Sequence, residues 1–106
     1  MDPHRLAEER SLAYHRAVAE RLRRDPALIG LARDRVRGWL AEGRVPHYAG
    51  EWERILSGHV AAICEAIVAE GDEARALRQA TPFAGAIDPR ERWRIWKAER
   101  QRHERP

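Results

Sequence analysis

The sequence predicts an all-α protein, a small helical bundle of about five helices. Ala, Arg, Leu and Glu dominate the composition and all four favour helices, whereas β-branched residues are few. Apolar residues recur at helical spacing, and three Asp-Pro pairs, which are typical of helix starts, punctuate the chain. With 106 residues, 43% of them hydrophobic, the chain suits a single globular unit.

Two helices are predicted in the first part of the chain. The first spans Pro3–Arg24 and the second Pro26–Glu42, each with an apolar residue about every four positions. Asp2 and Asp25 precede these helices and are expected to cap them, because a carboxylate can accept a free backbone N–H at a helix start. Gly43 is expected to end the second helix in the left-handed conformation.

The middle of the chain carries the longest apolar stripe. After a proline-containing loop at Arg44–Gly50, a helix over Glu51–Glu70 is expected to form the centre of the core. A short helix over Glu73–Gln79 follows, and then an unusually apolar loop, Thr81–Ile87. The last predicted helix is Pro89–Arg102.

We therefore divide the chain into a helical bundle over residues 1–80 and a segment over residues 81–106 that holds the apolar loop, a basic Trp-containing helix and a tail. Asp88 is expected to cap the last helix, and Glu91 three positions later completes a capping box. This helix either packs on the bundle or extends from it as an arm.

Charge is distributed unevenly along the chain. The net charge is +3, but residues 38–74 hold two arginines against seven acids, whereas residues 75–106 hold nine basic residues against four acids. Such a pattern indicates either internal pairing or two faces for different partners. No apolar run is long enough to span a membrane, and residues 1–10 lack the apolar core of a signal peptide. We therefore expect a cytoplasmic protein without membrane contact.

No pattern of catalytic or metal-binding residues is evident. The five histidines show no metal-ligand spacing, and no CxxC, HExxH, GxSxG or glycine-rich phosphate loop occurs. Cys64 lies among apolar residues, which favours a buried, inert thiol. We expect no enzyme activity, no metal and no cofactor.

One enzymatic pattern is an alternative. Arg10 and His15, and again Arg54 and His59, have the spacing R-x4-H, which resembles the motif of HEPN-type ribonucleases. The resemblance implies that the arginine holds a phosphate and the histidine transfers a proton. The family usually has a polar residue after the arginine, which the first pair has and the second lacks. Neither pair lies near the C-terminal end of the domain, where the family usually places its motif.

The C-terminal segment is the predicted partner-binding site. Trp and Arg dominate many protein interfaces. The apolar side chains of this segment are unfavourable in water, so we expect either the bundle or a partner to bury them. The residues expected to bind a protein partner are Phe83, Ile87, Arg90, Arg92, Trp93, Arg94, Trp96 and Lys97. The same cations and indoles also suit nucleic acid, so a nucleic-acid-binding or transcription-regulating protein is a second alternative. Without a base-reading element, we expect any such binding to be weak and non-specific.

Two pieces of the chain, SLAYHRAVAERLRRDP and ALRQATPFAGAIDPRERWRIW, resemble small helical antitoxins that are encoded beside bacterial toxins. The resemblance implies a non-catalytic protein that neutralises a toxin-like enzyme by covering its active site. The residues by themselves lead to a helical protein-binding module, with self-association left open.

Overall fold

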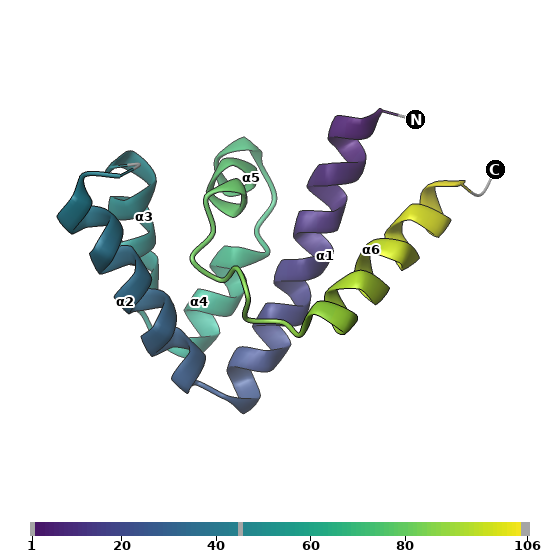
Figure 1. The fold of residues 1–106 in the computed structure, drawn as a ribbon. Helices are drawn as coiled ribbons and strands as arrows, with labels where there is room; N and C mark the ends of the chain where they lie inside the picture. The colour runs from purple at the N-terminus through teal and green to yellow at the C-terminus, as the bar shows by residue number, and fades with distance from the viewer. Residues whose placement is uncertain (1, 45, 105–106) are drawn as a thin grey trace.

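The computed structural model describes residues 2–44 and 46–104, which form six α-helices and no strand (Figure 1). The predicted all-α class is confirmed. The helices are α1 (Pro3–Arg24), α2 (Ala27–Glu42), α3 (Pro46–Leu56), α4 (Val60–Ile67), α5 (Asp72–Gln79) and α6 (Pro89–Glu104). There is one more helix than the sequence predicts, because a predicted helix is split in two.

Two of the three Asp-Pro pairs cap helices as predicted. In Asp2 and Asp88 a carboxylate oxygen accepts a hydrogen bond from the backbone N–H two residues further on, at 3.0 and 2.8 Å. The prediction for Asp25 is wrong, since α2 starts without a side-chain cap. The backbone N–H of Asp25 instead donates to the carbonyl of Arg21 at 2.8 Å, so this residue closes α1.

The turn between α2 and α3 is shorter than predicted. Gly43 ends α2 with a φ of 68°, the left-handed conformation expected there. However, α3 already begins at Pro46, inside the segment Arg44–Gly50 predicted as a loop. Proline is tolerated in the first turn of a helix, where its missing N–H costs no hydrogen bond.

The predicted helix Glu51–Glu70 is two helices, α3 and α4, which meet at Ser57, Gly58 and His59. The hydroxyl of Ser57 donates to the carbonyl three residues back at 2.6 Å. His59 has an extended backbone, and its Nδ1 accepts the N–H three residues ahead at 3.1 Å, which makes it the N-cap of α4. The apolar pattern runs across this break, so periodicity alone does not reveal it.

The core is built around α1, which packs against α2, α4, α5 and α6, while α3 packs on α2. The prediction that residues 51–70 supply the core helix holds in part, because Trp52, Ile63 and Ile67 from this segment are fully buried. The indole N–H of Trp52 donates to the carbonyl of Leu77 at 3.2 Å. This bond satisfies the one polar group that the indole brings into the core.

The loop Thr81–Ile87 is part of the core. Phe83 and Ile87 each expose only 2% of their surface. The hydroxyl of Tyr14 donates to the carbonyl of Phe83 at 2.6 Å, and Arg35 donates to two further carbonyls of the loop at 3.1 and 2.7 Å. The bundle itself therefore covers Phe83 and Ile87, two of the residues assigned to a partner surface.

Helix α6 packs along α1 and runs antiparallel to it (Figure 1). Near the start of α6, Glu91 accepts a hydrogen bond from Arg21 at 3.1 Å rather than closing the predicted capping box. Near its end, His103 bonds to Glu9. The C-terminal helix is thus docked on the bundle and is not an extended arm. None of the described helices is both long and apolar enough to cross a bilayer.

Candidate binding site around helix α6

One face of α6 is turned away from α1. Arg90, Trp93, Arg94 and Lys97, at spacing i, i+3, i+4 and i+7, lie on this face, and all four are exposed. We call them the α6 stripe. Trp93 exposes 62% of its surface. Four of the eight residues predicted to bind a partner therefore lie together on one open face.

The α6 stripe is strongly basic. No carboxylate among the described residues forms an ion pair with Arg90, Arg94 or Lys97, whereas Arg100, one turn further on, pairs with Glu104 at 3.2 Å. The long-range ion pairs of α6 run to α1 and not to the acidic segment 38–74. The charge of the stripe is thus directed at solvent.

Of the other two predicted residues of α6, Trp96 contacts Arg10 of α1, while Arg92 is exposed and lies over the Trp96 ring. The guanidinium carbon of Arg92 lies 5.0 Å from the centroid of the Trp96 ring, and that of Arg10 lies 5.6 Å from it. Both distances are within the range of a cation–π interaction. Trp96 is half-buried as a result, so its ring faces arginines of the same chain rather than open solvent.

A cleft of about 340 Å³ lies beside Trp96, between α1, α5, the loop and α6. Arg10, Arg78 and Arg92 line it, together with His15 and Thr81. Arg78 is buried, and its Nη1 donates to two carbonyls at the end of α4, at 3.3 and 2.8 Å. The described lining residues include no carboxylate.

The first R-x4-H pair, Arg10 and His15, lines this cleft. His15 exposes 1% of its surface. Its Nδ1 lies 2.7 Å from the carbonyl of Ser11, which can only accept, so Nδ1 carries the proton. Its Nε2 then accepts from the hydroxyl of Thr81 at 2.8 Å. Burial lowers the pKa of His15 to about 4, which keeps the ring neutral at pH 7. Both ring nitrogens are engaged in bonds within the fold, which gives His15 a structural role.

The second pair, Arg54 and His59, does not converge. Arg54 donates to Glu51 at 2.8 Å and is exposed, while the Nδ1 of His59 caps α4. The hydrogen bond from Arg54 and its charge lower the pKa of Glu51. Each residue thus has a local partner on its own helix or cap, and the pair does not form a joint site.

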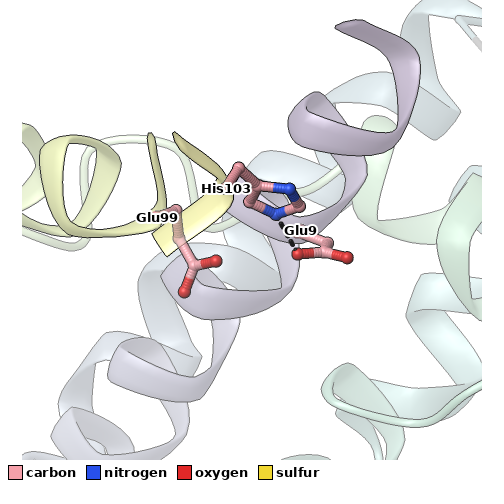
Figure 2. A group of neighbouring side chains, drawn as sticks. All are labelled: Glu9, Glu99 and His103. Carbon is pink, nitrogen blue, oxygen red and sulfur yellow. Dashed lines mark hydrogen bonds and ion pairs between the residues drawn. The ribbon is translucent and has the colours of Figure 1, made fainter. Parts of the chain in front are cut away.

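A second cluster, which the sequence does not suggest, joins the two ends of the chain. Glu9 on α1 lies beside Glu99 and His103 on α6, and one potential ligand atom from each lies within 4.8 Å of the others (Figure 2). Such a set can hold a cation. Here, however, Arg5 pairs with Glu9 at 3.3 Å, and Arg102 pairs with both carboxylates at 3.4 and 2.8 Å. We interpret the cluster as an ion-pair clasp between α1 and α6.

The clasp stabilises the charged form of Glu9. Burial by itself raises the pKa of this carboxyl, but the hydrogen bonds from His103 and Arg5 and their charges together lower it. A carboxyl whose folded pKa is lowered stabilises the fold at neutral pH and loses this contribution in acid.

Comparison with protein-family models, curated proteins and solved structures finds no match to this chain. The functional assignment therefore depends on the residues described above. The four residues of the α6 stripe and Arg10 were among the candidates predicted from the sequence, whereas Arg78, Glu9 and Glu99 were not. No sequence pattern predicts these three residues, because the side chains around each of them come together only when α5 or α6 packs on α1.

Proposed function

We propose that the protein is a non-catalytic helical binding module that attaches to an acidic surface of a partner protein through the α6 stripe. The exposure of Trp93 among three cations without a described counter-ion supports the proposal most directly. An indole with 62% of its surface exposed is unfavourably hydrated, so its burial in an interface contributes to affinity. The surrounding cations favour an acidic surface and raise the rate of encounter with it.

The resemblance to antitoxins suggests the kind of partner. On this proposal the partner is a toxin-like enzyme, and the α6 stripe covers its active site. A basic helix with one exposed aromatic residue suits an acidic or nucleotide-binding cleft. The chain supplies attachment and steric cover, and no residue of the stripe needs to take part in chemistry.

The stripe favours protein over nucleic acid for a specific reason. Single-stranded nucleic acid is bound by several aromatic rings on which successive bases stack. Trp93 can offer its ring in this way, but the ring of Trp96 is covered by Arg10 and Arg92. One exposed indole with a few cations supports only weak, salt-dependent binding to nucleic acid.

The test uses the products of the genes adjacent to this one, each co-expressed with the full chain. We expect one of them to co-purify, and Trp93→Ala to weaken that complex by about 2 kcal/mol, roughly 30-fold in Kd. Leu31→Ala is the matched control, because Leu31 is equally exposed, at 65%, but lies on α2. Equal affinity of wild type and Trp93→Ala would remove the stripe from the interface.

A second measurement separates this proposal from the ribonuclease alternative. The purified chain should not cleave RNA. If it does, and if His15→Gln or His59→Gln abolishes cleavage while the circular dichroism spectrum is unchanged, the HEPN-type function replaces ours.

A further inference from the structure

The cleft beside Trp96 concentrates positive charge from three distant parts of the sequence. Arg10 comes from α1, Arg78 from α5 and Arg92 from α6. The guanidinium groups of Arg10 and Arg92 form no hydrogen bond or ion pair with any described residue. Some other arginines of α1 and α6 are paired, as Arg21 is with Glu91. Three cations therefore converge on a cleft whose described lining includes no carboxylate.

One guanidinium N–H in this cleft lacks a hydrogen-bond acceptor. The Nε of Arg10 is buried and has no hydrogen-bond partner among the described residues. A buried N–H without an acceptor is costly, and a positively charged one more so. Burial and the charges of Arg75 and Arg16 also lower the pKa of Arg78, although the nearby charge of Glu8 acts in the opposite direction. An anion in the cleft would supply an acceptor and offset the repulsion.

The walls of the cleft indicate what the anion is attached to. Besides the arginines, the cleft is lined by Ala7, Tyr14, Ala84 and Trp96, which present mainly apolar surface. Its volume of about 340 Å³ is at the lower end of the range for small-molecule sites, roughly 300–1,000 Å³. Aromatic walls beside guanidinium groups suit a flat organic body that carries an oxyanion, since planar guanidiniums bind phosphate and carboxylate with directed hydrogen bonds.

We propose that this cleft binds a small organic oxyanion, a phosphate or carboxylate carried on a flat, aromatic body of mononucleotide size. Arg10 and Arg92 hold the oxyanion, and Arg78, fixed by the carbonyls of α4, contributes its charge from the floor of the cleft. Ala7, Tyr14 and Ala84 line the space for the flat body, and the ring of Trp96 lies beside the two arginines that cover it. This site is distinct from the α6 stripe, which lies on the opposite face of the same helix.

The site can be tested by following backbone amide signals of the full chain by NMR during titration. The ligands are AMP, benzoate, adenosine and inorganic phosphate. We expect AMP or benzoate to cause saturable shifts at Ser11, Thr81 and Ala84, and to bind at least about tenfold more tightly than adenosine or phosphate. Binding of AMP alone assigns a phosphate site, and binding of benzoate alone assigns a carboxylate site. If neither causes saturable shifts at these residues at millimolar concentration, the proposal is wrong.

Matched variants show whether the arginines are responsible. Arg92→Gln and Arg10→Gln should each weaken binding roughly 10- to 100-fold, because each removes a charge-assisted hydrogen bond. Arg94→Gln removes the same charge from the same helix, but on the stripe, and should leave the affinity unchanged. An equal loss in Arg92→Gln and Arg94→Gln, or binding of adenosine as tight as that of AMP, would show that the cleft does not recognise the anion. Arg94→Gln is instead expected to lower the affinity for the protein partner. Each of the two proposals can therefore be refuted while the other stands.

Discussion

Acidification between about pH 7.5 and about pH 5 should destabilise the fold through His15. The pKa of the buried ring is lowered to about 4, while the unfolded chain has its ordinary value of 6.5. A group with a lowered folded pKa binds its proton more readily in the unfolded state. Its stabilising contribution is therefore complete above the unfolded pKa of 6.5 and is lost as the pH falls toward 4.

The size of the effect follows from these two pKa values. Between about pH 7.5 and about pH 5 the unfolded chain gains nearly one proton at this position and the folded chain almost none, which is worth about 2 kcal/mol. With an m-value of about 1–3 kcal/mol/M, the urea midpoint should fall by roughly 1–2 M. Urea unfolding followed by tryptophan fluorescence at the two pH values measures this shift directly.

Two variants make the assignment specific to this ring. His15→Gln should lose most of the difference between the two pH values, because the amide does not titrate. His47→Gln makes the same substitution at an exposed position and should keep the difference. If wild type has the same midpoint at both pH values, or if His15→Gln retains the full difference, His15 is not the buried neutral ring described above.

Three further outcomes are expected. Tyr14→Phe should cost about 1 kcal/mol in urea unfolding, since it removes the 2.6 Å bond to the loop carbonyl; an unchanged midpoint would contradict this. Gly43→Ala should destabilise the fold by about 1 kcal/mol, because the φ of Gly43 is 68°. Gly30→Ala, in a helix with open space around it, should stabilise the fold by up to about 1 kcal/mol. A change of the same sign in both variants would contradict the structure. Glu9→Gln should speed amide hydrogen exchange over the last turn of α6, while Glu20→Gln on exposed α1 surface should not; equal rates in both variants would rule out the clasp.

Much of the fold follows from local signals, which is why the sequence predicts it well. The caps at Asp2 and Asp88 and the glycine at position 43 act within a few residues, and the structure confirms them. The break at Gly58 was not predicted, because the apolar spacing continues from α3 into α4. The N-cap of α4 is a histidine, which is not one of the residue types that usually indicate a helix start. The predicted cap at Asp25 was wrong because this residue ends α1 and does not cap α2.

The candidate sites depend on tertiary packing and were predicted only in part. The composition of α6 indicated a binding helix, but only its contact with α1 decides that Trp93 faces outward and Trp96 inward. Phe83 was assigned to a partner surface because the sequence does not show that the ring of Trp52 lies 6.0 Å from it, edge to face, in the core. The cleft requires α1, α5 and α6 together, so the approach of Arg78 to Arg10 could not be foreseen.

The central position of α1 has a consequence for biosynthesis. Helix α1 is synthesised before two of its partners, because Tyr14 bonds to Phe83 and Glu9 to His103, at separations of 69 and 94 residues. Such distant contacts form only after the second residue of each pair has been synthesised, and they carry the entropic cost of closing long loops. Until then α1 keeps apolar surface uncovered. The part of the α1 surface that the loop and α6 cover is thus accessible to proteases and chaperones until those two segments have been synthesised.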